Sequence, residues 1–333
     1  MKQKNSGRAW MAAAAIVSTT LMGDAMGQLV PERLYYGAGR SIPMQVTVPE
    51  AGGDVEIALF APGATTPTET ASAEAGRVDL AGLFPVLWTN QSPKLLYAQL
   101  LVGGERIGAP VVLQPLLSPP VASAVQRAGG PPSIEWSERG ATYSGLRAYV
   151  DQHVILETSL GEIEIRLRPD QAPNTAYNFA ELADGGLYTD VIFHRIVPAL
   201  GDGSPFVIQV GDPTGRGDGG PGYNIDLERS SLPHDFGVVS MARTGDPNSN
   251  GSQIFICLSR AGTARLDGLY TAFGETVRGA DAIQAIAGVP LADPQAGRPV
   301  EPPVIKTARL VPAPPFGTGP GPVKASDAAA PAR

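Results

Sequence analysis

Arginine, glutamine and aromatic residues gather in four short segments, and these are the residues whose types could do chemistry. The segments read FHRI at Phe193–Ile196, FVIQ at Phe206–Gln209, NGSQIFI at Asn250–Ile256, and LDG at Leu266–Gly268 with Tyr270, Phe273 and Gly274 close behind. They place one arginine, two glutamines and several aromatic rings on neighbouring predicted strands. No nucleophile–base pair is evident among them, so the segments do not indicate covalent catalysis.

Other residues in this region are weaker candidates. Cys257 lies in an apolar strand, where a buried and inert thiol is typical, so a thiol hydrolase has little support. His194 and His234 could be bases, but neither has a clear partner in the sequence. The run Gly215–Gly222 (GRGDGGPG) precedes neither a lysine–serine pair nor a helix, so it predicts a turn-rich loop and no phosphate site.

Short strands and two short helices must position these segments. A hairpin joins Val154–Glu157 to the alternating Glu162–Arg168, and one helix begins at Pro173 and ends at Gly185-Gly186. A second helix is predicted from Asp281 to Ala287. Further strands are predicted over 191–197, 206–211, 236–242, 253–258 and 304–311. This count predicts an all-β dominated domain, a closed antiparallel barrel with helices over its ends.

The chain as a whole divides into five predicted parts. Residues 1–27 read as a signal peptide, 28–117 as a small β-sandwich-like module of unknown role, 118–133 as a linker, 134–311 as the barrel domain and 312–333 as a disordered tail. In the module, short apolar strands alternate with turns, and Gly103-Gly104 indicates a hairpin. The linker is rich in proline and glycine, and the tail has too little apolar content to pack.

Composition excludes several classes of function. The 333 residues carry a net charge of −7 with no cluster of lysine and arginine, so nucleic acid is not an expected partner. One cysteine and three histidines argue against a four-ligand zinc site, and we expect no metal and no cofactor. Mean hydropathy is near zero, and no run reaches the ~18 apolar residues of a membrane helix.

The N-terminal segment predicts export. Lys2, Lys4 and Arg8 precede an apolar run from Ala9 to Met22, and small residues follow. Ala25 and Gly27 suit a cleavage site, so the mature chain is expected to begin near Met26 or Gln28. We therefore expect a periplasmic or secreted protein.

The ordered set of segments FHRI, QVGD, SMAR, NGSQIFI and LDG…Y..FG resembles the cyclophilin family of peptidyl-prolyl cis/trans isomerases, from His153 to about Leu310. The resemblance implies an eight-stranded antiparallel barrel with two capping helices and a peptide groove on its outside. It also implies the site residues. The catalytic set is Arg195, Gln209 and Phe255, and the substrate-binding set is Phe206, Val207, Ala242, Arg243, Gln253, Leu266 and Tyr270.

This sequence departs from the family pattern at several of these positions. Val207 replaces a common methionine, Arg243 a frequent asparagine, Arg265 the tryptophan of cyclosporin-sensitive members and Tyr270 their histidine. We therefore expect weak cyclosporin binding. The stretch Ala199–Pro205 is longer than the usual link, so a loop is expected beside the groove.

The function implied is a rotamase that accelerates X-Pro bond rotation while exported proteins fold, with proline-containing peptides and unfolded exported proteins as partners. Rotation breaks no bond but is opposed by ~18–20 kcal/mol. A guanidinium at Arg195 can bind the prolyl nitrogen better in the twisted amide than in the planar one. The alternative is a cyclophilin-fold binding module that holds proline-containing segments with little or no turnover.

Overall fold

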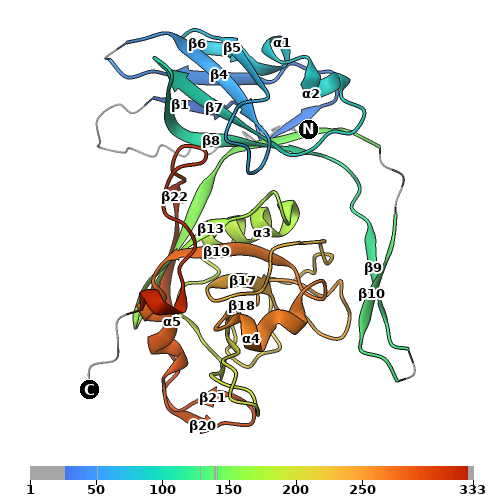
Figure 1. Cartoon of the computed structure of the whole chain (residues 1–333), viewed down its shortest axis with the longest axis vertical. Coiled ribbons are helices and arrows are strands. Elements are labelled where there is room, and N and C mark those ends of the chain that lie inside the picture. The colour runs from blue at the N-terminus through green and yellow to red at the C-terminus, as the bar shows by residue number, and fades with distance from the viewer. Residues whose placement is uncertain (1–26, 51, 128, 139, 141, 329–333) are drawn as a thin grey trace, which may run out of the picture.

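A computed structural model describes residues 27–50, 52–127, 129–138, 140 and 142–328, which form two β-rich units joined by a long ribbon and a C-terminal tail (Figure 1). The predicted signal peptide lies outside the described residues except for Gly27. No helix in the described ranges is long and apolar enough to cross a membrane.

The N-terminal unit consists of two sheets. The smaller has the order β1-β3-β6 and the larger the order β2-β11-β8-β7-β4-β5. The strands are β1 Gln28–Pro31, β2 Tyr35–Gly37, β3 Pro43–Thr47, β4 Val55–Phe60, β5 Glu69–Ser72, β6 Gly76–Asp79, β7 Leu96–Val102, β8 Glu105–Pro115 and β11 Gly145–Val150. Two one-turn helices, α1 Leu80–Leu83 and α2 Val86–Thr89, connect β6 to β7. Gly103 and Gly104 both have positive φ, as the tight turn of the predicted β7–β8 hairpin requires.

The predicted linker is a β-ribbon, and the predicted domain boundary lies too early. β9 (Val121–Val125) pairs with β10 (Ser133–Ser137), and the ribbon runs along the second unit (Figure 1). β11 then pairs with β8 in the N-terminal sheet, so the barrel unit begins near Asp151 and not at 134. Composition misled the prediction because proline and glycine occur at the ends of β9 and β10, and because β11 pairs with β8, which lies before the ribbon in the chain.

The second unit is built on one sheet with the order β14-β22-β12-β13-β19-β17-β18-β16-β15. Its strands are β12 Gln152–Thr158, β13 Gly161–Leu167, β14 Val191–Ile192, β15 Arg195–Val197, β16 Val207–Val210, β17 Val238–Met241, β18 Ile254–Cys257, β19 Ala272–Arg278 and β22 Val304–Pro312. The two edge strands, β14 and β15, are separated in the chain by only Phe193 and His194. The sheet therefore curls round until its ends meet. The assigned strands number nine where eight were expected, because the chain bends between β14 and β15.

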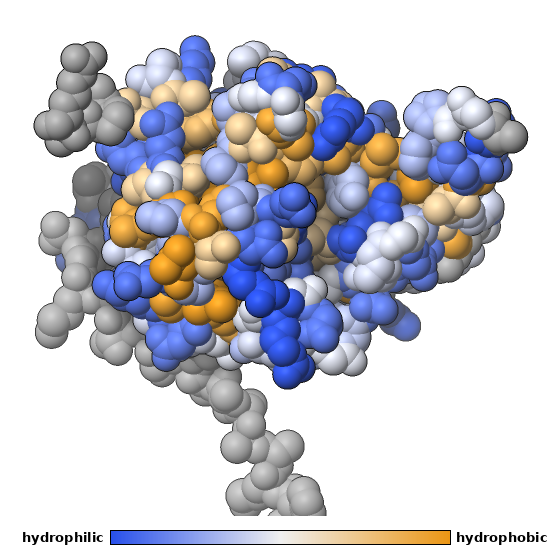
Figure 2. Space-filling model, turned by 90° about the horizontal axis from the view of Figure 1, so that it is seen from below, coloured by the Kyte–Doolittle hydropathy of each residue, from blue (hydrophilic) through white to orange (hydrophobic). Residues whose placement is uncertain are grey.

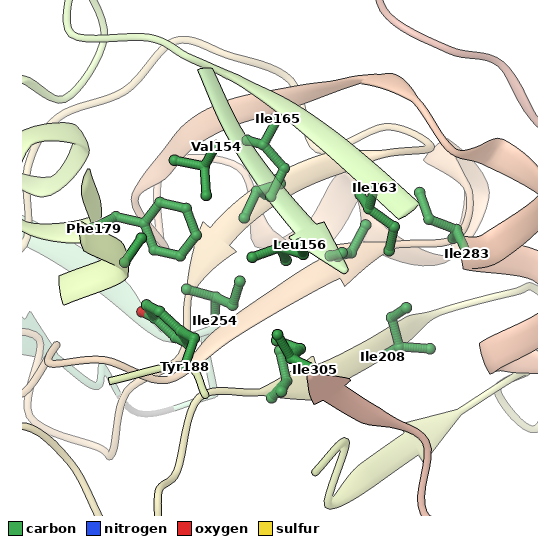
Figure 3. Packing of buried hydrophobic residues seen from close by; sticks show 14 of the residues in the cluster. Val154, Leu156, Ile163, Ile165, Phe179, Tyr188, Ile208, Ile254, Ile283 and Ile305 are labelled. Atoms are coloured by element: carbon green, nitrogen blue, oxygen red, sulfur yellow. The ribbon is translucent and has the colours of Figure 1, made fainter. Parts of the chain in front are cut away.

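Alternation along these strands builds the core. Leu156, Ile163, Ile208 and Ile254 are fully buried and point into one cluster (Figure 3). β19 was not predicted because six of its seven residues are buried, so it shows no period of two. Its Glu275 is paired with both Arg166 and Arg168, which explains how a carboxylate can lie in a central strand.

Two helices pack on different parts of this sheet. α3 (Pro173–Asp184) contacts β22, β19 and β12, while α5 (Ala280–Ala287) contacts β13, β16 and β15. Both match the predicted helices. α3 has no capping side chain of its own, and Glu228 supplies one by accepting from the backbone N–H groups of Asn174 and Thr175. Smaller elements complete the unit: α4 Arg260–Thr263, η1 Ala264–Leu266, β20 Leu291–Asp293, β21 Arg298–Pro299 and η2 Ala325–Asp327.

The tail up to Ala328 is ordered, contrary to the prediction. Phe316 stacks against Phe60 and Tyr97 of the N-terminal unit, with ring centroids 4.8 and 4.9 Å apart. The chain then returns to the barrel unit, where the Val323 N–H donates to the Thr276 carbonyl at 2.9 Å. The Phe316 N–H also donates to Gln99 Oε1 at 2.7 Å. Composition does not reveal these contacts.

Candidate active site

Three neighbouring strands present the predicted polar residues on the outer face of the sheet. Ile196, Ile208, Ile254 and Ile256 point into the core, so the residues between them point outward. Antiparallel register places Arg195 opposite Gln209, and Gln209 opposite Phe255. The alternation of β15, β16 and β18 therefore assembles a site from segments 60 residues apart in the chain.

A chain of hydrogen bonds orders the polar side chains. Arg195 Nη1 donates to Gln209 Oε1 at 3.3 Å, and Gln209 Nε2 donates to Gln253 Oε1 at 2.9 Å. Gln253 Nε2 donates in turn to the carbonyls of Gly217 and Gly219, at 3.0 and 2.9 Å. The bond to Gln209 is the only side-chain hydrogen bond of Arg195 among the described residues. Its other N–H groups are therefore available to a ligand.

The glycine-rich loop holds Gln253, and one carboxylate organises the loop. Asp212 accepts hydrogen bonds from the backbone N–H groups of Thr214, Gly217 and Gly219 and from the Thr214 hydroxyl. Although burial opposes it, this set of donors lowers the pKa of the Asp212 carboxyl to about 2. A Cβ at Gly219 would lie 2.1 Å from Asp212 Oδ1, so the close approach requires glycine. Sequence reasoning missed Asp212; the signal was a turn-forming aspartate directly before a glycine-rich run.

Beside this chain lies an apolar cluster on the outer face of the sheet. Its buried members are Val207, Val238, Phe255, Cys257, Leu266 and Ala272, and the half-buried Phe206, Leu232, Ala242 and Tyr270 pack against them. Phe255 is 5% exposed and meets the Tyr270 ring edge-on, with centroids 5.6 Å apart. The cluster offers aromatic and aliphatic side chains against which a small apolar ring could pack.

Arg243 and Arg265, which depart from the family pattern, each stack on an aromatic ring of this cluster. The Arg243 guanidinium lies 4.6 Å from the Tyr270 ring centroid and donates to the carbonyls of Leu269 and Thr244. The Arg265 guanidinium lies 4.9 Å from the Phe206 ring centroid. Both are cation–π contacts, so the walls are reinforced by charged groups.

The two histidines weighed as bases are His194 and His234. His234 donates or accepts between Asp267 Oδ1 at 2.9 Å and Ser240 Oγ at 3.0 Å, an arrangement found in hydrolases. Ser240 is fully buried, however, and the His234 ring stacks under Phe255, so no substrate can reach the serine. Burial lowers the pKa of both His194 and His234. The three residues Asp267, His234 and Ser240 therefore support the Phe255 ring.

The remaining weak candidate is also closed. Cys257 is fully buried within the apolar cluster, and burial raises the pKa of its thiol. A thiolate nucleophile is therefore disfavoured, as the apolar strand predicted. Among the described residues, no group of three or more histidine, cysteine, aspartate or glutamate side chains could hold a metal ion.

The Ala199–Pro205 insertion extends the hairpin between β15 and β16. Leu200 and Ser204 close it with a backbone hydrogen bond, and Ser259 Oγ anchors it by donating to the Pro205 carbonyl at 2.7 Å. A cavity of about 660 Å³ is lined by Gln209 and Gln253 and by residues of the loops at 217–224 and 242–251. No residue of the insertion lines that cavity.

The structure brings all ten predicted site residues together. The polar chain consists of Arg195, Gln209 and Gln253. Six of the other seven belong to the apolar cluster, and Arg243 stacks on Tyr270 of that cluster. Their roles in catalysis and binding stay predictions. What the sequence did not show is the support: Asp212 beneath the loop, His234 beneath Phe255, and Arg265 over Phe206.

Comparison with known proteins agrees with this arrangement. Residues 153–310 match the model of the family described as cyclophilin type peptidyl-prolyl cis-trans isomerase/CLD. Peptidyl-prolyl cis-trans isomerase ppi1 of Schizosaccharomyces pombe is 45% identical over 164 residues, which are 47% of this chain and 99% of that protein. A peptidyl-prolyl cis-trans isomerase of Synechococcus elongatus is 43% identical over 122 residues, 37% of this chain and 78% of that one. The chain therefore belongs to the cyclophilin-type peptidyl-prolyl cis-trans isomerase family.

Other relatives are longer, and the match covers one part of them. Peptidyl-prolyl cis-trans isomerase-like 2 of Rhizopus delemar is 43% identical over 139 residues. These residues are 40% of this chain and only 24% of that protein. A crystal structure of a cyclophilin type isomerase from Cryptosporidium parvum shares 32% identity over 49% of this chain and 99% of that one, with a TM-score of 0.44.

Proposed function

We propose that the barrel unit accelerates cis/trans rotation of X-Pro bonds in extended polypeptide segments. The observation that carries this proposal is the Arg195–Gln209–Gln253 chain, which lies beside the apolar cluster around Phe255. In this proposal the cluster is the proline pocket. The proline ring enters the pocket between Phe206, Phe255 and Tyr270. This fixes one side of the amide while the other side turns.

The geometry suits stabilisation of a twisted amide. In that state the prolyl nitrogen becomes pyramidal and regains its lone pair, which a guanidinium N–H of Arg195 can then bind. Gln209 holds Arg195 by accepting from it, and it is held in turn by Gln253, so the donor is preorganised. Apolar walls exclude water and strengthen the field of the charge. The reaction requires no bond to break and no proton to move.

The test is a relaxation assay on the full chain. A short X-Pro peptide is brought out of cis/trans equilibrium, and its return is followed with and without protein. A rate that rises linearly with protein concentration supports the proposal. Background rates combined with measurable peptide affinity would replace it with the binding module.

We further propose that the chain is exported and acts on proteins folding outside the cytoplasm. The basic and apolar segment at its N-terminus supports this. N-terminal sequencing of material recovered from outside the cytoplasm tests it, and a retained Met1 on a cytoplasmic protein would contradict it. Weak cyclosporin binding is proposed on the same sequence basis, because Arg265 and Tyr270 replace the residues of sensitive members.

A further inference from the structure

Arg265 occupies the rim of the proposed proline pocket. It directly precedes Leu266, a buried pocket residue, and its guanidinium lies over Phe206, another wall of the same pocket. A client proline seated against Phe206 and Leu266 therefore places its neighbouring residues close to this guanidinium. Each extended residue spans only ~3.3–3.6 Å, so the affected client positions are one or two residues from the proline.

The charge of Arg265 is also available. Its side chain is exposed, and it makes no hydrogen bond or ion pair with another described residue. A guanidinium stacked on a ring keeps its N–H groups free in the plane of the stack, where they can bind a carboxylate in bidentate fashion. Arg243 differs, because its N–H groups already donate to the carbonyls of Leu269 and Thr244.

Three carboxylates of this region are engaged by other groups. Asp267 is taken up by Arg260 and His234, and Asp212 lies within the glycine-rich loop. Asp218 pairs with Arg216. The guanidinium groups of Arg195, Arg243 and Arg265 thus lie around the proposed proline pocket, on a chain whose net charge is −7. Such a local positive field selects for negative ligands.

One carboxylate of the insertion does interact with Arg265. Asp202 is fixed by accepting from the Ser204 N–H at 2.9 Å. That hydrogen bond, with a smaller contribution from the charge of Arg265, holds the pKa of the Asp202 carboxyl below its usual range.

We propose that Arg265 is a specificity-determining residue, which favours client segments carrying aspartate or glutamate one or two residues from the proline. This inference rests on the proposed use of the groove for X-Pro segments. Exposed ion pairs contribute modestly, so we expect an acidic peptide to exceed its amide counterpart by about threefold in kcat/KM and in affinity. The preference should fall as salt rises, because exposed charges are screened.

The experiment uses one proline peptide with Asp, Asn or Lys placed before or after the X-Pro pair. Isomerisation rate and peptide affinity are measured separately for the full wild-type chain, Arg265→Gln, Arg265→Lys and Arg77→Gln. Arg77 lies in the N-terminal unit, paired with Glu32, and its variant makes the same change in net charge. We expect Arg265→Gln to abolish the preference for Asp over Asn, Arg265→Lys to keep part of it, and Arg77→Gln to leave it intact.

The two readouts separate the inference from the function on which it rests. Equal affinity for Asp, Asn and Lys peptides in wild type, or a preference that survives Arg265→Gln, overturns the role of Arg265. Acid-selective affinity without turnover supports Arg265 while the isomerase proposal fails.

Discussion

The amide of Gln209 donates to Oε1 of Gln253 at 2.9 Å, which joins the Arg195 side of the site to the glycine-rich loop. Gln209 uses its own oxygen to accept from Arg195, so a single amide orients both neighbours. The position of the proposed catalytic donor thus depends on a loop whose own shape is set by Asp212.

Replacing Arg195 with alanine should lower the isomerase rate by about 10²–10³, the effect of removing one preorganised donor worth ~2.7–4 kcal/mol. Thermal stability should change little, because the side chain is only partly buried and makes one described hydrogen bond. Arg195→Lys should recover little activity, since lysine keeps the charge but loses the planar fork. Kinetics and melts of the three proteins decide this, and an alanine variant within about threefold of wild type would show that another group is the donor.

Asp212→Asn should loosen the loop and release Gln253. The carboxylate accepts four hydrogen bonds, and an amide can replace only part of them, so we expect a loss of about 1–3 kcal/mol in stability. Misplacement of Gln253 should lower the rate by about tenfold to a hundredfold. Ser231→Ala, at an exposed serine outside this loop, serves as a control for the preparation.

The same carboxylate predicts a pH dependence. Its pKa of about 2 lies below the unfolded value of about 3.9, so its contribution is complete above the unfolded value and is lost as pH falls toward 2. The difference in unfolding free energy between wild type and Asp212→Asn should be constant from about pH 5 to 8 and shrink below about pH 4. Denaturant titrations across this range measure it. A difference that stays constant down to pH 2 would rule out the ionised carboxylate as its source.

Phe316→Ala should weaken the connection between the tail and the N-terminal unit. The ring stacks on Phe60 and Tyr97, and the backbone N–H donates to Gln99 Oε1 at 2.7 Å. Removing a half-buried phenyl ring should cost about 1–2 kcal/mol in the stability of the N-terminal unit. Calorimetry should show this unit unfolding earlier while isomerase activity is retained. Thr318→Ala, at an exposed position of the same tail, should leave the melt unchanged.

A fragment from Asp151 to Pro312 should fold and turn over by itself, because it contains every strand of the nine-stranded sheet. A fragment that begins at Ile134 carries most of β10 and all of β11 without their partners in the N-terminal part, so it should be less soluble. Melts and relaxation rates of both fragments test this. Aggregation of the shorter fragment, with the full chain soluble, would show that the barrel unit needs its contacts with the N-terminal unit, of which that of Arg147 with Tyr177 is one.

Figure 2 shows hydrophobic patches interrupted by hydrophilic side chains on the face seen from below. The β9–β10 ribbon is held to the barrel unit by Asn248 Nδ2, which donates to the Ala122 carbonyl at 3.0 Å, and by Arg229, which pairs with Glu138 and lies over Trp136.

The sequence by itself predicted most strands and both helices of the barrel unit and, through the family resemblance, the candidate site residues. The alternation of β13, the helix beginning at Pro173 and the segments around Arg195, Gln209 and Gln253 are local patterns, and local patterns are set by neighbouring residues. Only the tertiary structure decided where β11 pairs, that β19 lies at the centre of the sheet, and that the tail is fixed by Phe316. It also placed Asp212 under the loop and Arg265 over Phe206. Apart from Asp212, which binds its own loop, these are contacts between segments distant in the chain. Their free energy comes from pairing, burial or charge that no single segment contains.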